Sequence, residues 1–317
     1  MQLNMNSEIF TSSESLPYIL TLLRCVQDGK HVWVADENEA TAAKAYMQEH
    51  VPSLADSYSS LAQKGTVQIQ WIGATQKPAV ITIRADNLGD AAHDLSRPAV
   101  VVVEDLTSDG SFLISLCAIF GADRITAAHS NGWLEIRHGG GGGSLPSVTR
   151  AEINLFRRHV RVAALLDSDR LVPGEHTDAY NRAEALQKLG ATVHVLELRE
   201  IENYVPNRAL AAVRPQRTSS RRLKFLKRLT SDQRAVYDMK HGFGPASSPP
   251  VIPPRQVPVY GGLSQETLRG LRSGFGRNVA SCMNGMTTTL TKRDFHGLGT
   301  SVVAEITTML QNLARII

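Results

Sequence analysis

Cysteine is scarce in this chain, and long apolar runs are absent. The 317 residues include three cysteines, Cys25, Cys117 and Cys282, which are widely spaced and form no CxxC pair. This pattern argues against a disulfide framework or a cysteine-based zinc site, and it is typical of a reducing compartment. No apolar run approaches the length of a membrane span, and the N-terminus lacks a basic segment followed by an apolar one. We therefore expect a cytoplasmic protein with no membrane partner.

Aromatic residues are also few, at 6%, yet apolar residues make up 42% of the chain. This composition is enough for a sizeable core, and the length allows one large domain or two ordinary ones. The phosphate-binding pattern GxxxxGK[ST] does not occur in the sequence. If the function requires an ATPase, we expect that ATPase to be a separate chain.

Acidic residues are missing from one long stretch. The net charge of +4 is unevenly distributed. Residues 1–100 hold 7 Lys and Arg against 11 Asp and Glu and are acidic overall. The remainder holds 27 of the 34 basic and 19 of the 30 acidic residues and is basic overall. Residues 208–228 contain no acid and eight basic residues: Arg208, Arg214, Arg217, Arg221, Arg222, Lys224, Lys227 and Arg228. Such a block indicates a polyanionic partner, with a solvated helix face as the alternative.

The chain alternates between helix-like and strand-like segments. In residues 1–96 the patterns predict helices at 16–29 and 38–50 and strands at 31–36, 67–73 and 79–85. Residues 97–206 have predicted strands at 99–105, 133–138, 160–169 and 192–198, with helices between them. Short connections between alternating strands and helices predict a parallel sheet flanked by helices, with the chemistry at the carboxyl ends of the strands.

The last third of the chain, residues 207–317, is predicted to be mostly helical. Its first part is the basic block, and residues 244–258 are too rich in proline for a helix or an interior strand. Further helices are predicted at 264–283 and 301–316. We therefore predict three regions: an N-terminal α/β region (1–96) with a partner-binding or regulatory role, a central α/β domain (97–206) and a basic helical region (207–317).

Acids or glycines follow each predicted strand of the second region. In chain order they are Glu104, Asp105 and Asp109; the glycine run 139–143; Asp167 and Asp169; and Glu200 and Glu202. Several carboxylates at one sheet edge need a hard divalent cation, and oxygen ligands favour Mg²⁺ or Mn²⁺ over zinc. Each group taken alone has a simpler reading: a helix start, a surface loop, or ion pairs of the two glutamates with Arg199 and Arg208.

This order of motifs resembles the TOPRIM domain, a catalytic fold shared by topoisomerases, bacterial primases and the nucleases of the OLD (overcoming lysogenization defect) family. The resemblance covers residues 98 to 206. The segment "REIENYVP" (199–206) is similar to the one that follows the DxD strand in OLD-like nucleases and in TOPRIM effectors of phage defence. Segments 237–244 and 259–276 are similar to the tails of such nucleases. The fold implied is a TOPRIM-like parallel sheet flanked by helices.

The resemblance implies a nuclease that uses Mg²⁺ or Mn²⁺ in a two-metal mechanism. Glu104 would be catalytic and would also bind metal, as would Asp109, Asp167, Asp169 and Glu202, while Lys240 would stabilise charge on the phosphate. In the first motif Asp105 takes the place of a glycine, and Asp109 lies five rather than four positions after Glu104, so the two aspartates compete for one role. Gly140, Gly141 and the basic residues Arg217, Arg221, Arg222, Lys224, Lys227 and Arg228 would contact phosphates or the nucleic acid.

Three functions remain open at this stage. The first is a metal-dependent nuclease, with DNA favoured over RNA, acting as a toxic effector in antiviral defence under a separate ATPase or sensor protein. The second is a non-catalytic TOPRIM-fold subunit that binds nucleic acid or acts as a sensor. The third is a phosphotransferase of the haloacid-dehalogenase type, because "LLDSD" (165–169) also resembles its aspartate loop. A homo-oligomer is compatible with each of them.

Overall fold

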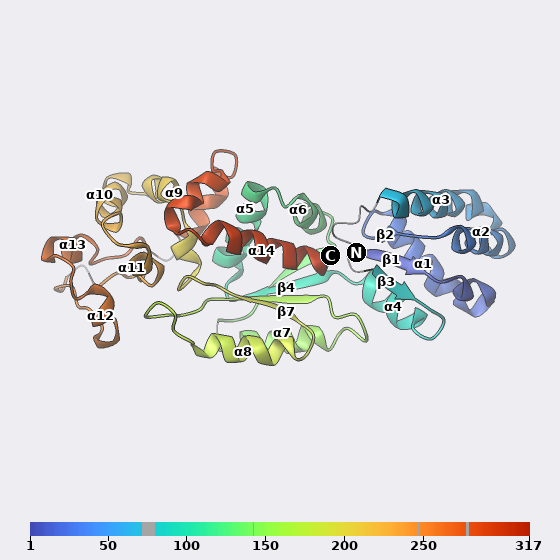
Figure 1. Cartoon of the computed structure of the whole chain (residues 1–317), viewed down its shortest axis with the longest axis horizontal. Coiled ribbons are helices and arrows are strands. Elements are labelled where there is room, and N and C mark those ends of the chain that lie inside the picture. The colour runs from blue at the N-terminus through green and yellow to red at the C-terminus, as the bar shows by residue number, and fades with distance from the viewer. Residues whose placement is uncertain (72–79, 142, 246, 277–278) are drawn as a thin grey trace.

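The computed structural model shows an α/β protein with two parallel sheets, each flanked by helices. It describes residues 1–71, 80–141, 143–245, 247–276 and 279–317. Three parts follow one another along the long axis, with the N-terminal unit at one end and the larger sheet in the middle (Figure 1). The helices of residues 216–270, called the C-terminal helices below, form the other end, whereas the last helix of the chain lies over the larger sheet. In the described part of the chain, no helix is long and apolar enough to cross a membrane.

The N-terminal unit is built on a sheet of three strands in the order β2-β1-β3, all parallel. The strands are β1 (Gln2–Met5), β2 (Val32–Trp33) and β3 (Val80–Ile83). The α-helices are α1 (Leu16–Gln27), α2 (Glu37–His50), α3 (Ala55–Trp71) and α4 (Leu88–Ser96), and the 3-10 turns are η1 (Ser7–Thr11), η2 (Ser13–Ser15) and η3 (Pro52–Leu54). Strands and helices of this unit bury one common core.

The strand predicted at 67–73 is wrong over residues 67–71, which continue helix α3; residues 72 and 73 lie outside the described part. A period of two over seven residues is too short to outweigh a helix that already began at Ala55. Gly65 lets this helix lie against β2, since an added Cβ would come within 2.9 Å of the Trp33 carbonyl oxygen.

A buried polar cluster joins the N-terminal unit to the central sheet. The fully buried carboxylate of Asp94, at the end of α4, accepts the backbone N–H groups of Arg157, Arg158 and His159 at 2.8–2.9 Å. Arg161 is also fully buried, and its guanidinium donates to the carbonyl oxygens of Arg97 and Ile316, both at 2.8 Å. Because buried charges need such partners, this junction fixes the two units to each other.

The central sheet has four parallel strands in the order β5-β4-β6-β7. They are β4 (Ala99–Val103), β5 (Leu134–His138), β6 (Val162–Leu166) and β7 (Thr192–Val195). Helices α5 (Ser111–Phe120), α6 (Asp123–Ser130) and α14 (Val302–Arg315) cover one face, and α7 (Leu145–Ile153) and α8 (Asp178–Gln187) cover the other (Figure 1). The parallel sheet predicted for residues 97–206 is therefore confirmed.

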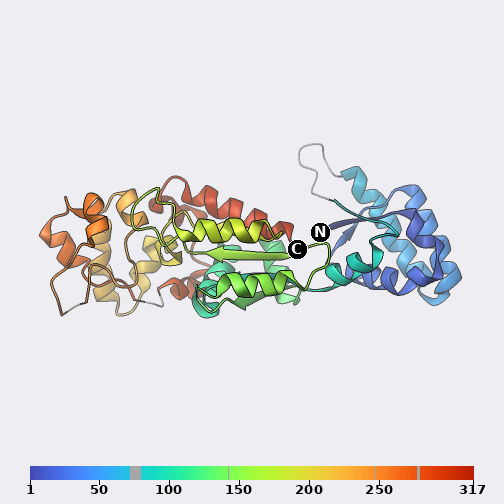
Figure 2. The same ribbon diagram turned by 90° about the horizontal axis from the view of Figure 1, so that it is seen from below.

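The apolar runs of the two central strands follow from this two-sided burial. Every residue of β4 and β6 is buried. Along β4, Val101 and Val103 join the core that contains α5 and α14, whereas Val100 and Val102 join the core beneath α7 and α8. A strand covered on both faces needs apolar residues at every position, which is the pattern seen in the sequence. The strand arrows point away from the N-terminal unit and toward the C-terminal helices (Figure 2).

The C-terminal part consists of short helices and turns, followed by α14. The α-helices are α9 (Asn207–Ala212), α10 (Gln216–Leu226), α11 (Ser231–Ala235), α12 (Val257–Tyr260) and α13 (Gln265–Gly270). The turns are η5 (Ile201–Tyr204), η6 (Pro254–Gln256), η7 (Ala280–Met286) and η8 (Lys292–Leu298).

The described residues of the proline-rich segment form neither helix nor strand up to residue 253, as predicted for a loop, but η6 and α12 then begin within it. The single helix predicted at 264–283 is wrong, because α13 ends at Gly270 and η7 begins only at Ala280. Where α13 ends, Gly270 lies against the Phe225 ring, since an added Cβ would come within 2.2 Å of that ring.

Candidate metal and phosphate site

The strand order of the central sheet brings the predicted motifs into one row. The glycine turn follows β5, Glu104 follows β4, and Asp167 and Asp169 follow β6; the segment after β7 leads to Glu200 and Glu202. Because the strands are parallel, all four motifs lie at the same edge, which faces the C-terminal helices. This arrangement was predicted from the sequence.

Mutual repulsion shows in the ionisation of these carboxyl groups. Burial, and then the charges of Asp169 and Asp109, raise the pKa of Glu104 above its usual value. Burial, and then Glu104, Asp109 and Glu202, raise the pKa of Asp167 well above its usual value. Each of these groups is therefore sensitive to the charge of the others, which is the behaviour expected of a shared cation site.

Residues 167–169 are held against the segment that follows β7. Asp167 Oδ1 accepts the N–H of Ile201 at 3.1 Å, and the buried Ser168 hydroxyl donates to the Leu198 carbonyl oxygen at 2.8 Å. The Asp169 N–H donates to the Arg199 carbonyl oxygen at 3.0 Å. Asp169 has a left-handed backbone, φ 54°, and its side chain is exposed. A non-glycine residue rarely adopts this backbone, so the contacts on both sides of the motif hold it there.

The first motif contains a single π-helical turn, Leu106–Gly110, labelled η4. Asp105 is exposed to solvent and caps this turn, because its carboxylate accepts the Ser108 N–H at 2.7 Å. The hydrogen bonds from Ser108 lower the pKa of Asp105. Asp109 is buried, accepts the Asp105 N–H at 3.0 Å and the Ser108 hydroxyl at 2.7 Å, and has a raised pKa because of its burial. A π turn accommodates one extra residue. It thereby turns Asp109, rather than Asp105, toward the other carboxylates.

The glycine turn lies directly beside Glu104. The Gly139 N–H donates to the Val103 carbonyl oxygen at 2.7 Å, and the Gly141 N–H donates to that of Glu104 at 3.2 Å. Gly140 and Gly141 have φ values of 77° and 85°, and Ser144 Oγ donates to the Gly140 carbonyl oxygen at 2.7 Å. The N–H of Gly141 thus supports the Glu104 backbone, so this group does not meet the expectation of an available phosphate donor.

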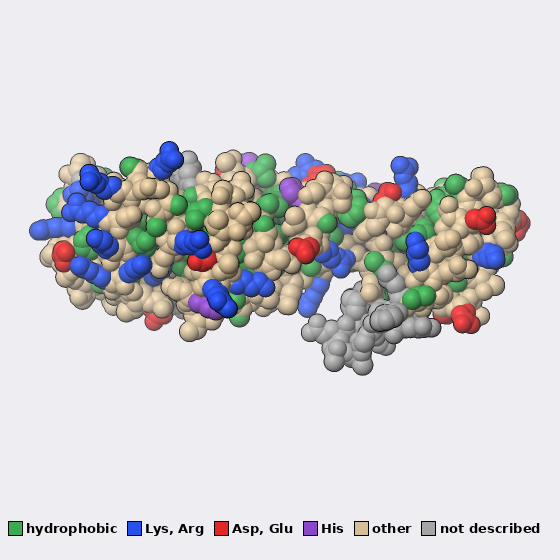
Figure 3. All heavy atoms as spheres, turned by 90° about the horizontal axis from the view of Figure 1, so that it is seen from above, with side chains coloured by type: hydrophobic (Ala, Val, Ile, Leu, Met, Phe, Trp, Pro, Cys, Tyr) green, Lys and Arg blue, Asp and Glu red, His purple; other side chains and the backbone are tan. Residues whose placement is uncertain are grey.

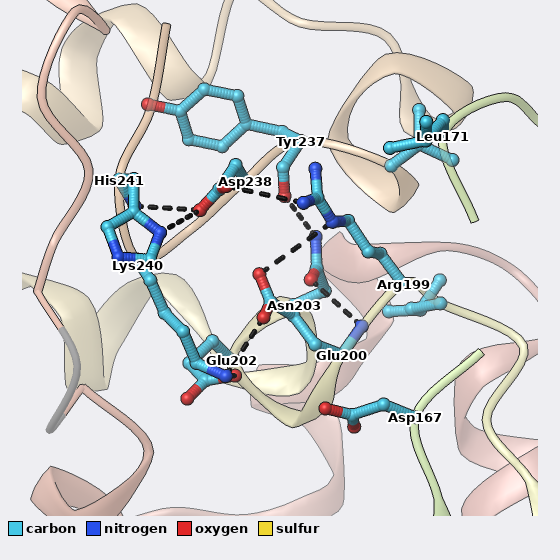
Figure 4. A network of polar contacts seen from close by, with 12 residues as sticks. Asp167, Leu171, Arg199, Glu200, Glu202, Asn203, Tyr237, Asp238, Lys240 and His241 are labelled. Atoms are coloured by element: carbon cyan, nitrogen blue, oxygen red, sulfur yellow. Dashed lines mark hydrogen bonds and ion pairs between the residues drawn. The ribbon is translucent and has the colours of Figure 1, made fainter. Parts of the chain in front are cut away.

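The second half of the site is an ion-pair cluster around Lys240. Its Nζ lies 2.9 Å from Glu200 Oε2 and 3.2 Å from Glu202 Oε2, and Figure 4 shows the lysine reaching down to both glutamates. Glu202 is fully buried, and burial raises its pKa to about 7. Burial alone would lower the pKa of Lys240, but Glu200 and Glu202 outweigh that effect and raise it above its usual value.

Glu200 and Glu202 do not form the surface ion pairs with Arg199 and Arg208 that the sequence suggested as the simpler reading. Glu200 is buried and lies 4.0 Å from Arg199 Nε, a longer contact than its ion pair with Lys240. Arg208 donates instead to the Thr289 carbonyl oxygen at 2.7 Å. Sequence position alone suggested the neighbours Arg199 and Arg208, because Lys240 is distant along the chain.

Two residues that support this cluster were not singled out from the sequence. Asn203 donates to the carbonyl oxygens of Arg234 and Tyr237, both at 2.9 Å, and so ties η5 to the segment that leads to Lys240 (Figure 4). Glu305, on α14, accepts the Tyr204 hydroxyl at 2.6 Å and the Glu197 N–H at 2.8 Å. The only signal for Asn203 was its place inside the segment 199–206.

The two tail segments noted in the sequence pack against each other and fix the backbone of Lys240. The Phe275 N–H donates to the Met239 carbonyl oxygen at 2.6 Å, and the Gly276 N–H donates to that of Lys240 at 3.2 Å. A Cβ on Gly274 would lie 2.4 Å from the Lys240 carbonyl carbon. Glycine is therefore required at 274 for this close approach.

Replacing Gly274 by alanine is expected to destabilise the protein by about 1–3 kcal/mol, because the Lys240 backbone must move. Chemical denaturation would measure the change. Gly262→Ala is the matched control: an added Cβ there meets nothing within 4 Å, so its stability should stay near that of the wild type. Equal stability of the two variants would contradict the packing described here.

The basic block forms the surface of α10 and of the turn after it. Arg217, Arg221, Lys224, Lys227 and Arg228 are exposed and Arg222 is half-buried, while Leu223 and Leu226 point into the core. Arg228 also pairs with Glu266 at 2.8 Å and lies over the Phe225 ring. Figure 3 shows basic side chains gathered at the end of the molecule that the C-terminal helices form.

Metal binding is compatible with the residues at this edge. Within the described ranges, no three His, Cys, Asp or Glu side chains are already positioned together to hold a metal ion. However, Oε1 of the buried Glu202 has neither a hydrogen bond nor an ion pair among those residues, and Glu200 Oε1 has only the 4.0 Å contact with Arg199 Nε. Buried carboxylate oxygens without donors need a cation. The donor set, all oxygen, suits Mg²⁺ or Mn²⁺.

Comparisons of this chain with protein-family models, with curated proteins and with solved structures found no match.

Proposed function

We propose that this protein is a nuclease that depends on Mg²⁺ or Mn²⁺ and cleaves phosphodiester bonds, as its resemblance to TOPRIM nucleases implies. The observation that carries the proposal is the convergence of acids from three strand ends, with raised pKa values for Glu104, Asp109, Asp167 and Glu202. A structural role gives no reason to keep mutually repelling, partly buried carboxylates at a strand edge.

Glu104, Asp109, Asp167, Asp169 and Glu202 would hold the metal. When bound, divalent ions would activate a water molecule and neutralise charge on the phosphate. Burial raises the pKa of Glu104 above its usual value, which is the direction that suits a group that takes up and returns a proton. The ammonium of Lys240, half-buried beside the acids, would stabilise negative charge on the phosphate.

The direct test incubates the purified protein with plasmid DNA, single-stranded DNA and RNA in Mg²⁺, Mn²⁺ or EDTA. We expect cleavage in either metal and none in EDTA, with DNA cut more readily than RNA. Calorimetric titration of Mn²⁺ into the same protein accompanies the assay. Intact substrates together with no heat of Mn²⁺ binding would refute the nuclease.

A non-catalytic subunit that binds nucleic acid is the second candidate. The ion pairs of Lys240 with Glu200 and Glu202 favour it, since they neutralise part of the acidic cluster without any metal. That candidate predicts salt-sensitive binding of nucleic acid without Mn²⁺ binding, so the calorimetric titration separates the two. In either case, by the same resemblance, we propose a role in antiviral defence, as a toxic effector if the protein is a nuclease, under a separate ATPase or sensor protein.

Removing three charges from α10 is expected to weaken nucleic-acid binding about equally for all sequences. In Arg217→Ala/Arg221→Ala/Lys224→Ala, the slope of log K against log salt should become shallower by about 2 to 3, since fewer counterions are released. The control removes three exposed charges from the N-terminal unit: Lys44→Ala/Lys64→Ala/Arg84→Ala. Fluorescence anisotropy at several salt concentrations measures the slopes, and equal slopes for the two triple variants would rule out α10 as the contact surface.

A further inference from the structure

The cation that Glu200 and Glu202 share in this structure is the ammonium of Lys240. Glu202 is 0% exposed and Glu200 is 7% exposed, so neither charge is hydrated by bulk water. Lys240 Nζ reaches both glutamates, at 2.9 Å and 3.2 Å. Two buried carboxylates so close together require positive charge between them, and Lys240 supplies it.

The neighbouring arginine does not replace Lys240 in this role. Arg199 Nε is 4.0 Å from Glu200 Oε1, and its Nη2 lies 3.3 Å from Asp238 Oδ2, so Arg199 spans two acids with looser contacts (Figure 4). With Lys240 in place, Glu202 Oε1 still lacks a hydrogen bond or ion pair to the described residues, and Glu200 Oε1 has only the distant contact with Arg199. One ammonium thus leaves the pair only partly satisfied.

Lys240 has a fixed backbone and a side chain that can leave. Its carbonyl oxygen accepts the Gly276 N–H, and the close approach of Gly274 prevents movement of the main chain. The side chain, in contrast, is 27% exposed and has four flexible methylene groups. The ammonium can therefore swing away from the glutamates into solvent without disturbing the fold.

A divalent ion and an ammonium compete for the same carboxylate oxygens. The ion carries twice the charge and coordinates several oxygens at once. Lys240 contacts one oxygen of each glutamate, which leaves Glu202 Oε1 without an ion pair and Glu200 Oε1 with only the 4.0 Å contact to Arg199. Both cations together at Glu202 would repel each other. The ion pairs of Lys240 therefore oppose metal binding at Glu202.

We propose that Lys240 is a resident cation that holds Glu200 and Glu202 together in the metal-free protein and is displaced when a divalent ion binds. This inference rests on the proposed metal site at Glu202. Displacement would free the ammonium beside the metal, where an incoming phosphate group could meet it. Lys240 would then link occupation of the metal site to binding of the substrate phosphate.

The test titrates Mn²⁺ into Lys240→Met by calorimetry, without nucleic acid. We expect Mn²⁺ to bind at least tenfold more tightly than to the wild type, because no ammonium has to be displaced. Lys188→Met is the matched control, since Lys188 is an exposed lysine that pairs with a different glutamate, Glu184, at 2.7 Å. It removes the same charge and should leave the affinity for Mn²⁺ unchanged.

The outcomes separate this inference from the proposed function. Equal or weaker Mn²⁺ binding by a folded Lys240→Met, relative to the wild type, overturns the resident cation and leaves the nuclease standing. Failure of wild type and variant alike to bind Mn²⁺ overturns both. If Lys240→Met does not fold, a crystal structure of the wild type with Mn²⁺ decides: Lys240 Nζ should have left both glutamates, and its retention beside a bound metal would overturn the inference.

Discussion

Replacing Asp167 by asparagine is expected to reduce metal-dependent cleavage by about a thousandfold or more, while the metal-free protein becomes more stable. The loss follows because the side chain no longer offers a charged oxygen to a divalent ion, and such ions contribute several kcal/mol to phosphoryl transfer. The gain follows because burial and the charges of Glu104, Asp109 and Glu202 all oppose a charge at Asp167. An amide of the same shape relieves that repulsion, and its carbonyl oxygen can still accept the Ile201 N–H.

Opposite changes in activity and stability distinguish a functional carboxylate from a structural one. Cleavage, Mn²⁺ affinity and denaturation midpoint should be measured on the same preparation. Asp178→Asn is the control, because it removes the same charge at an exposed position. Asp178 lies at the start of α8, a helix that covers the same sheet. If Asp167→Asn cleaved like the wild type, or if it lost stability while keeping its affinity for Mn²⁺, the metal role of Asp167 would be wrong.

The metal-free protein is expected to lose stability as the pH rises from about 4.5 to about 7. Glu202 has a pKa of about 7 in the folded protein against a usual value of 4.5. Between these values the folded state keeps a proton that the unfolded state has released, so the contribution to stability is full below pH 4.5 and disappears as the pH passes 7. For Glu202 alone this amounts to about 3 kcal/mol. The raised pKa values of Glu104, Asp109 and Asp167 act in the same direction.

A divalent cation should reverse this loss, because it binds the ionised carboxylates of the folded state and not those of the unfolded chain. The measurement is chemical denaturation between pH 4.5 and pH 8, once in EDTA and once in Mg²⁺. Glu202→Gln should reduce the pH dependence in EDTA, because the contribution of Glu202 is gone while those of Glu104, Asp109 and Asp167 remain. A wild-type free energy of unfolding that does not fall over this range, or that Mg²⁺ leaves unchanged at pH 8, would contradict a cation site at this edge.

The sequence by itself determined the parallel sheet and the motifs at its edge. The runs at 99–103 and 162–166 are apolar at every position, a pattern that only two-sided burial requires, and the acids and glycines come where those runs end. Such patterns are local, so they can be recognised in the sequence without knowledge of the fold. A local pattern can also mislead: residues 67–71 alternate as in a strand but belong to helix α3.

Tertiary structure alone decided which charges meet. Lys240 lies about forty residues beyond Glu200 and Glu202, and its place depends on the packing of Gly274 against the Lys240 backbone. The choice between Asp105 and Asp109 depended likewise on a π-helical turn that no periodicity announces. Secondary structure and burial produce a periodic pattern of apolar residues in the sequence, because residues at a fixed spacing lie on the same face of a helix or strand. Ion pairs between distant segments produce no such pattern, since their partners become neighbours only when the chain has folded.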